Sequence, residues 1–308
     1  MSGMAPTARH TEPPLAAFSV DVEDYFQVEA LRHLCPRERW DQFADRTEAN
    51  TDRLLDLLAR HQARGTFFVL GWVASRHPGL VRRIAAAGHE IASHGFDHEL
   101  VYRQSPDAFR ADVRRARALL QDLSGQEILG YRAPSYTIVR RTLWALQILR
   151  EEGYQYDSSI FPIHRRRYGM PGAPRWPHLR LLEGGRSITE YPLPTVRLGP
   201  FNLPATGGAY LRLLPFRFQM WAVRRILVQK QPFLLTIHPW EIDPDQPRLP
   251  VGLRTRWTHY YNLKRTEERL EGLLELARYR PISEILRILS LLEREGAPAS
   301  DPLGRTWQ

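Results

Sequence analysis

The sequence predicts an α/β fold built on a parallel sheet or barrel. Short β-rich segments alternate with amphipathic helical segments along most of the chain, which is the pattern of repeated β-α-β units. The 308 residues suffice for one large domain, and shares of 43% hydrophobic and 25% charged residues are those of a globular protein. We expect this domain to span residues 16–295, between a disordered lead-in (1–15) and a disordered tail (296–308).

The alternation is clearest in the first half of the chain. Residues 16–22 alternate as a strand, and leucines at three-to-four spacing predict a helix over 47–64, which Gly65 ends. Ser105 followed by Pro106 is a typical helix start. The other expected elements here are strands over 66–70, 90–93, 128–132 and 154–157, and helices over 78–87 and 141–152.

The pattern breaks over residues 164–204, which are rich in proline, glycine and arginine. It then resumes, with a helix predicted over 216–229 and a buried strand over 233–237. Two further helices are expected over 263–277 and 282–293. We therefore expect an irregular insertion between two stretches of α/β structure.

Composition narrows the classes of function. The net charge of +9 suggests an anionic partner, but all 43 basic residues except Lys230 and Lys264 are arginines, mostly dispersed among acids. Without zinc-finger spacing or an RNP-like segment, we expect no nucleic-acid partner. The single cysteine, Cys35, excludes an intramolecular disulfide. Neither a transmembrane segment nor a signal peptide is evident, so we expect a cytoplasmic protein.

Unusual polar residues gather where predicted strands end. In parallel α/β folds the carboxyl ends of the strands form the edge at which ligands bind. Four clusters occupy this edge, and no GxSxG, P-loop or dinucleotide-binding motif competes with them. The clusters are Asp21-Val-Glu23-Asp24-Tyr25, His94-Gly-Phe-Asp-His98, Arg132-Ala-Pro134-Ser-Tyr136 and His238-Pro-Trp240-Glu.

Each cluster also has a purely structural interpretation, but together they suit metal-assisted chemistry. Three carboxylates in four residues repel one another unless a cation or a proton intervenes. His94 and His98, at i and i+4 on a helical turn, can share one metal ion. A nearby carboxylate would complete a two-histidine, one-carboxylate site that stays open to water and substrate. Arg132 can brace a carboxylate, and His238 is a candidate proton donor.

In this order the four clusters resemble the polysaccharide deacetylases of the NodB-homology, or carbohydrate esterase 4, type. The subgroup most similar is the one associated with exosortase (PEP-CTERM) and exopolysaccharide loci. The resemblance covers Phe18 to Glu293, and stretches beginning at Thr206 and His238 match the subgroup's C-terminal extension, about 200–295. It implies a distorted (β/α) barrel of about seven units. It also implies metal-dependent removal of N-acetyl groups from a polysaccharide or its precursor in exopolysaccharide biosynthesis.

The resemblance assigns roles to individual residues. His94 and His98 match the metal-binding pair, Arg132 matches the arginine that orients the catalytic carboxylate, and His238 matches the acid that protonates the leaving amine. The implied ion is Zn²⁺, with Co²⁺, Ni²⁺ or Mn²⁺ as alternatives. The residues that would contact the sugar are Tyr25, Pro134, Tyr136 and Trp240.

Three departures from the family pattern bear on these roles. Most members have two adjacent aspartates in the first motif; here we assign Asp24 as the metal ligand and Asp21 as the base, with Glu23 as the alternative for either role. Gly95 replaces the usual hydroxyl residue after the first histidine. Pro239 replaces the usual aspartate after the late histidine, so another residue must orient His238.

Other functions stay open at this level. Related barrels open cyclic amides with a similar set of carboxylates and histidines, and a barrel that failed to hold metal would be a non-catalytic glycan-binding module. The expected partner is an N-acetylated glycan, and peripheral association with an exopolysaccharide assembly is an open alternative to free solution.

Overall fold

A computed structural model describes residues 14–165, 167–229 and 231–292. The expected tail and residues 1–13 of the expected lead-in lie outside these ranges. Pro14 and Leu15, also assigned to the lead-in, are part of the fold. The Pro14 carbonyl accepts a hydrogen bond from the Arg278 N–H at 2.8 Å, and Leu15 opens the first strand.

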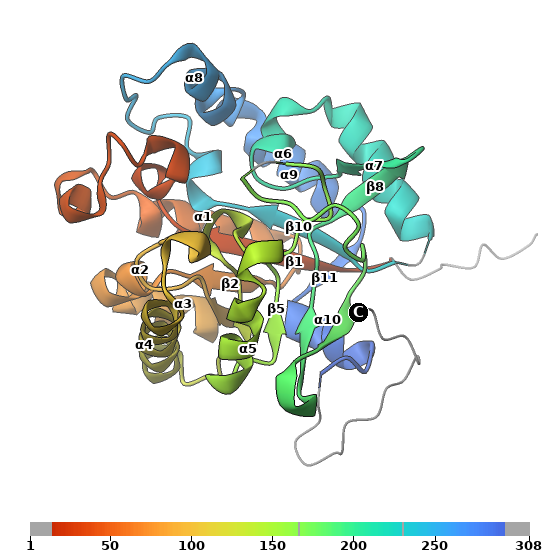
Figure 1. Cartoon of the computed structure of the whole chain (residues 1–308). Coiled ribbons are helices and arrows are strands. Elements are labelled where there is room, and N and C mark those ends of the chain that lie inside the picture. The colour runs from red at the N-terminus through yellow and green to blue at the C-terminus, as the bar shows by residue number, and fades with distance from the viewer. Residues whose placement is uncertain (1–13, 166, 230, 293–308) are drawn as a thin grey trace, which may run out of the picture.

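A row of seven parallel strands forms the sheet, with one antiparallel strand at its end (Figure 1). Among the described residues no backbone ladder joins β7 back to β10, but the Tyr191 hydroxyl donates to the Phe233 carbonyl across this gap at 3.4 Å. The prediction of a distorted (β/α) barrel of about seven units is confirmed. In sheet order the strands are β10 (Phe233–Ile237), β1 (Leu15–Val22), β2 (Thr66–Val69), β3 (Glu90–Ser93), β4 (Gly130–Tyr131), β5 (Tyr156–Asp157), β7 (Ser187–Glu190) and antiparallel β6 (His178–Leu181), while β11 (Arg278–Arg280) pairs with β1.

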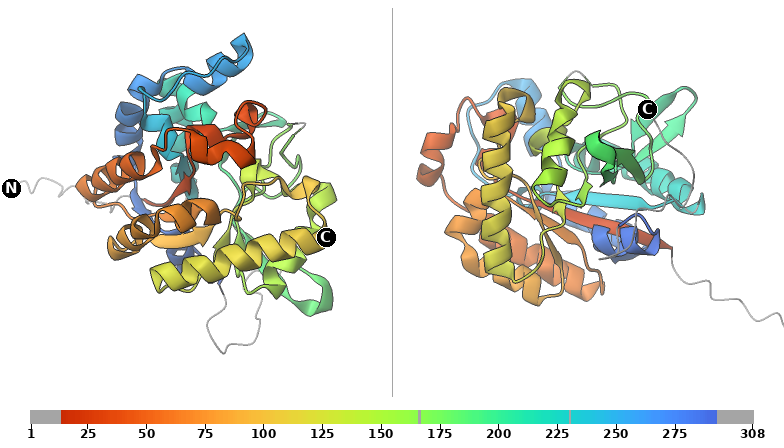
Figure 2. Two further views of the ribbon diagram at one scale, coloured as in Figure 1. Left: turned by 90° about the vertical axis from the view of Figure 1, so that its left-hand side faces the viewer. Right: turned by 60° about the horizontal axis from the view of Figure 1, so that its bottom comes forward.

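Helices cover the outside of this sheet, and the long α4 runs along it (Figure 2, yellow). None of the described helices has the length and apolar sequence needed to cross a bilayer. The α-helices are α1 (Thr47–Arg60), α2 (Gly71–Arg76), α3 (Pro78–Ala86), α4 (Pro106–Ser124), α5 (Trp144–Glu151), α6 (Ala209–Leu213), α7 (Phe216–Val228), α8 (Leu253–Tyr260), α9 (Thr266–Leu274) and α10 (Ile282–Ile288). Short 3-10 helices are η1 (Tyr25–Gln27), η2 (Glu29–Leu31), η3 (Arg37–Gln42), η4 (Val101–Arg103), η5 (Pro134–Tyr136), η6 (Arg140–Thr142), η7 (Glu183–Gly185), η8 (Pro239–Ile242) and η9 (Leu263–Arg265).

The expected irregular insertion contains regular structure. Within residues 164–204 lie β6 and β7, followed by a hairpin of β8 (Thr195–Leu198) and β9 (Phe201–Pro204). These strands have four residues each and pair over short antiparallel ladders, so they need no long apolar run. That is why their sequence resembles a loop.

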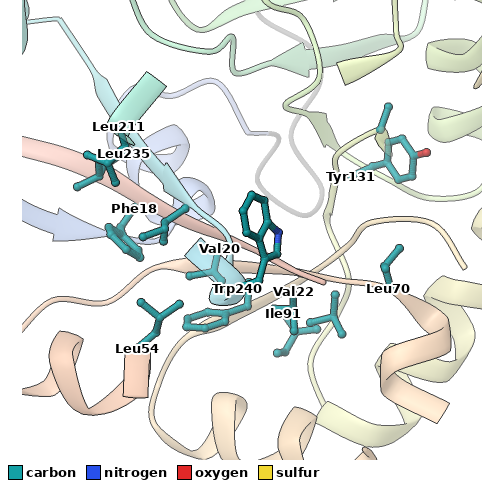
Figure 3. Close-up of a cluster of buried hydrophobic side chains, with 14 of the residues drawn as sticks. Phe18, Val20, Val22, Leu54, Leu70, Ile91, Tyr131, Leu211, Leu235 and Trp240 are labelled. Atoms are coloured by element: carbon teal, nitrogen blue, oxygen red, sulfur yellow. The ribbon is translucent and has the colours of Figure 1, made fainter. Parts of the chain in front are cut away.

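One hydrophobic core joins the two halves of the chain (Figure 3). It includes Leu54 and Ile91 from the N-terminal half and Leu211, Leu235 and Trp240 from the C-terminal half, all buried. Since burying side chains of this size stabilises by about 1.5–3 kcal/mol each, the C-terminal elements are an integral part of the barrel.

Acid is expected to destabilise the fold through His89. The side chain is 4% exposed, its Nδ1 accepts the Gly65 N–H at 3.1 Å, and burial lowers its pKa to about 4. In the unfolded chain His89 has an ordinary histidine pKa of about 6.5. Between about pH 6.5 and 4 it is therefore protonated in the unfolded chain but neutral in the folded protein. The contribution of neutral His89, roughly 3 kcal/mol, is therefore complete above about pH 6.5 and is lost as the pH falls towards 4.

Urea unfolding of wild-type protein and a His89→Leu variant between pH 7.5 and 4.5 measures this effect. The variant starts less stable because the hydrogen bond to Gly65 is gone, but its stability should depend less on pH. Parallel pH profiles for the two proteins would show that His89 is not the group responsible.

Candidate active site

Four strands of the barrel deliver their polar residues to one edge. Asp21 lies near the end of β1 with Glu23 just beyond it, the two histidines follow β3, Arg132 follows β4, and His238 follows β10. The side chains of Asp21, Glu23, His94, His98 and Arg132 are at most 5% exposed. The structure thus brings the expected clusters together in a largely dry environment.

Glu23, His94 and His98 form the group that could hold a metal ion. Their potential ligand atoms all lie within 4.8 Å of one another. Glu23 Oε2 is 2.7 Å from His98 Nε2 and 4.0 Å from His94 Nε2, so this buried oxygen faces both imidazoles. A buried oxygen in that position is suited to a cation, and one carboxylate with two imidazoles is a donor set that zinc accepts.

Hydrogen bonds and neighbouring charges favour the protonation states that Glu23 and His94 would need to bind a metal ion. His94 Nδ1 donates to the Arg132 carbonyl at 2.8 Å, which leaves the Nε2 lone pair facing Glu23. Burial lowers the pKa of His94 to about 4, so its ring is neutral. Burial favours the neutral form of Glu23, but the imidazoles of His98 and His238 outweigh it and lower the Glu23 pKa to about 2.

The two histidines do not lie on a helical turn, as their spacing had suggested. Residues 94–98 form a loop in which Gly95 has φ +75° and His98 has φ +53°, and this loop turns the second ring back to within 5.3 Å of the first. Gly95 is required here because a Cβ atom would lie 2.9 Å from Asp112 Oδ2, which accepts the Phe96 N–H. The glycine that departs from the family pattern therefore permits the turn.

The structure does not bring Asp24, our assigned ligand, into this group. One carboxylate oxygen of Asp24 accepts the Tyr25 N–H at 2.7 Å, and the other accepts the Arg46 N–H at 2.6 Å and the Thr47 hydroxyl at 3.1 Å. Both oxygens are thus occupied, one in capping η1 and the other in holding the start of α1, and burial raises the pKa of Asp24 to about 7. Glu23, the alternative, lies in this group instead.

Arg132 braces Asp21. The guanidinium is fully buried, and its Nη1 donates to Asp21 Oδ1 at 2.6 Å. Its Nε and Nη2 donate to the carbonyl and hydroxyl of Ser158 at 3.0 and 2.9 Å, which fixes the plane of the group. The other oxygen of Asp21, Oδ2, is 3.7 Å from His238 Nε2. Arg132 therefore fixes the Asp21 carboxylate through one oxygen and leaves the other directed at the site.

Glu241 orients His238, and we did not predict this residue from the sequence. Its Oε2 lies 2.8 Å from His238 Nδ1, and its Oε1 accepts from Arg212 Nε at 2.9 Å. Burial favours neutral forms of both groups, but Arg212 and His238 lower the Glu241 pKa to about 2, and Glu241 raises the His238 pKa to about 9. The signal in the sequence was a glutamate three residues after the histidine, a spacing that lets it reach back across η8.

Three of the four residues expected to contact sugar are buried instead. Tyr25 is 1% exposed, Pro134 is buried, and Trp240 is 4% exposed. The Trp240 indole stacks between His238 and His259, and its Nε1 donates to Glu23 Oε1 at 3.4 Å. These three side chains are therefore part of the packing around the site. Of the four residues, only Tyr136 is partly exposed.

The C-terminal half completes the site from the other side. Gly207 (φ +96°) and Gly208 (φ +50°) form a turn before α6, and a Cβ atom on Gly208 would lie 3.7 Å from His238 Cε1. Arg212, four residues later, supports Glu241. The stretch beginning at Thr206 therefore packs directly against His238.

Sequence comparison divides the chain into two matched regions. Residues 40–156 match the family model described as Polysaccharide deacetylase, and residues 158–287 match one described as Domain of unknown function (DUF3473). The first region includes His94, His98 and Arg132, and the second includes His238 and Glu241. Asp21 and Glu23 lie outside both.

Curated relatives and solved structures point the same way. The chain is 33% identical over 98 residues to a peptidoglycan-N-acetylglucosamine deacetylase of Bacillus cereus, and 32% identical over 97 residues to a chitooligosaccharide deacetylase of Rhizobium leguminosarum bv. trifolii. These alignments cover 32% and 30% of this chain, and 36% and 45% of the relatives' lengths.

Two solved structures share the fold. A Mycobacterium smegmatis protein proposed to be a polysaccharide deacetylase superposes with a TM-score of 0.61 at 22% identity, over 98% of this chain and 99% of its own. Puue allantoinase gives 0.59 at 15% identity, over 89% of each chain. By the match over residues 40–156, the curated relatives and the shared barrel, this chain is similar to polysaccharide deacetylases.

Proposed function

We propose that this protein is a metal-dependent deacetylase that removes N-acetyl groups from an N-acetylated glycan. The observation that supports the proposal is the group of Glu23, His94 and His98, which could hold a metal ion. It lies between two further polar residues, the carboxylate of Asp21, which is paired with Arg132, and the cationic His238. The relatives' printed names, peptidoglycan and chitooligosaccharide deacetylases, indicate the same class of substrate.

The residues divide the reaction between them. A divalent ion held by Glu23, His94 and His98, with Zn²⁺ as our first choice, would supply Lewis acidity towards the acetamide carbonyl and water. Asp21, held in place by Arg132, accepts the proton of the water that attacks the carbonyl carbon. As the C–N bond breaks, the proton on His238 Nε2 passes to the amine. The products are acetate and a glucosamine unit.

The finer assignment rests on the C-terminal half. We place the protein in exopolysaccharide biosynthesis on the cytoplasmic side, in peripheral association with an assembly, because the stretches at Thr206 and His238 resemble the exosortase-associated subgroup. Both stretches lie in the region matching the domain of unknown function, and both line the site.

Acetate release tests the proposal. Purified protein is incubated with short N-acetylglucosamine oligomers, with and without chelator, and acetate and free amine are quantified. Equal amounts of both products, lost on chelation and restored by Zn²⁺, are expected. Ureido products from a cyclic amide would instead indicate a ring-opening amidohydrolase. Glycan binding without turnover by metal-loaded protein would indicate a non-catalytic module.

Removing the proton donor or its orienting group should slow acetate release by different amounts. General acid catalysis contributes about 10²–10⁴-fold, so His238→Ala is expected to lose that factor. Glu241→Gln keeps the histidine but removes the negative charge that holds its proton, and we expect a loss of about 10²-fold. Steady-state kinetics on folded variants measures both. Unchanged kcat in Glu241→Gln would show that Glu241 has only a packing role.

A further inference from the structure

Four aromatic side chains form a cluster beside the candidate active site. Phe161 contacts the rings of Tyr136, Tyr168 and Tyr210, with centroid distances of 6.0 to 6.2 Å. Tyr136 and Tyr168 also meet edge-on at 6.3 Å. Phe161 is buried, whereas the three tyrosines are partly exposed. Partly exposed tyrosines on a buried aromatic base form a rigid amphipathic surface of the kind that covers apolar faces of ligands.

This aromatic cluster adjoins the reacting groups at two points. The Arg132 guanidinium, which holds Asp21, lies 5.9 Å from the centre of the Tyr136 ring. Burial and then the charge of Asp21 raise the pKa of the Tyr136 phenol well above its usual range, so this tyrosine lies within the field of the site. On the other side, Tyr210 follows the glycine turn that packs against His238. A glycan unit next to the one at His238 would reach the cluster.

An arginine stands at the exposed side of the cluster. Arg165 Nε donates to the Tyr210 hydroxyl at 3.2 Å, and that hydroxyl is 3.2 Å from the Tyr168 hydroxyl. Arg165 and Arg167 are both exposed, and within residues 14–165, 167–229 and 231–292 no ion pair joins either to a carboxylate. Some other exposed arginines do have carboxylate partners, for example Arg53 with Glu267 at 2.6 Å.

The sequence around this arginine supplies no compensating charge. Residues 158–182 contain neither aspartate nor glutamate, and the same holds for residues 191–240. Asp157, which borders the first stretch, is buried and accepts the hydroxyl of Ser159, whereas Glu183 at the other border is exposed. A guanidinium held by one nitrogen, with its other nitrogens free of a carboxylate, is suited to bind an oxyanion in bidentate fashion.

We propose that Tyr136, Tyr168, Tyr210 and Arg165 form a subsite for the unit next to the N-acetylated sugar, and that this unit carries an oxyanion bound by Arg165. The inference rests on the proposed function and adds to it that the natural glycan is acidic. The oxyanion is a carboxylate if the neighbour is a uronic acid, and a phosphate if the sugar is bound to a phosphorylated carrier.

Binding of matched products tests the subsite without turnover. The ligands are two trisaccharides with a central glucosamine, one flanked by glucuronate and the other by glucose, together with glucosamine and its 1-phosphate. Affinities are measured by calorimetry on the full chain with Zn²⁺ present, at low and high salt. We expect the oxyanion-bearing member of at least one pair to bind about tenfold more tightly at low salt. The pair that shows the preference identifies the source of the oxyanion.

Three variants assign the preference to its residues. Arg165→Gln should reduce it to within about twofold, whereas Arg82→Gln, which changes an exposed arginine on α3, should retain it. Tyr168→Leu should weaken both trisaccharides by a similar factor and leave their ratio unchanged. Equal binding within both pairs, a preference that survives Arg165→Gln, or no binding of any ligand would overturn the proposal. Because these ligands carry no acetyl group, failure of the proposed function would appear separately in the acetate assay.

Discussion

Replacing His94 with alanine is expected to abolish tight metal binding and to lower the rate of acetate release by at least about 10³-fold. His94 directs its Nε2 towards Glu23 because its Nδ1 is fixed by the Arg132 carbonyl, and alanine offers no nitrogen in that position. Elemental analysis of the purified variant and its kcat measure the two effects. Near-wild-type deacetylation by the alanine variant would eliminate the metal assignment.

The two neighbouring carboxylates provide a matched comparison for this prediction. Glu23→Gln should reduce both metal content and activity, because Glu23 Oε2 is the buried oxygen between the histidines. Asp24→Asn should keep the metal. Its main effect should be a loss of stability, since the Asp24 carboxylate accepts backbone N–H groups at the start of η1 and of α1. The reverse result would return the ligand role to Asp24.

The contrast between these carboxylates shows how much of the candidate site can be predicted from the sequence. Strand ends and motif order were enough to bring Asp21, the histidine pair, Arg132 and His238 to one edge, because parallel strands present their carboxyl ends together. Which acid points inwards depends on hydrogen bonds from Arg46 and Thr47, which are more than twenty residues away in the chain. That information is absent from the local motif.

The fold shows the same division between local and distant information. Strands over 90–93 and 233–237, and the helix start at Ser105 and Pro106, were predicted at the observed positions, because apolar runs and capping residues are local signals. The burial of Trp240 depends on stacking against His259 of α8, and β6 to β9 depend on pairing. The solvent exposure of a side chain and the pairing of short strands are difficult to predict from a single sequence.

The second large effect is expected at Arg132. Arg132→Met removes the guanidinium from a fully buried position and leaves the Asp21 carboxylate, 1% exposed, without its cationic partner. Breaking a buried ion pair on one side costs about 3–5 kcal/mol. By contrast, Arg32→Met breaks a half-exposed pair with Glu99 and should cost at most about 1 kcal/mol. Chemical unfolding of the two variants makes the comparison.

A double mutant separates the stabilising role of Arg132 from its catalytic one. Asp21→Asn alone should lower the rate of acetate release by about 10²–10⁴-fold, because the amide cannot accept the proton of water. In Arg132→Met/Asp21→Asn the uncompensated charge is gone, so the loss of stability should be smaller than the sum of the single losses. Activity should stay at the level of Asp21→Asn or below. Additive losses of stability would mean that Arg132 stabilises the fold through its bonds to Ser158 and not through Asp21.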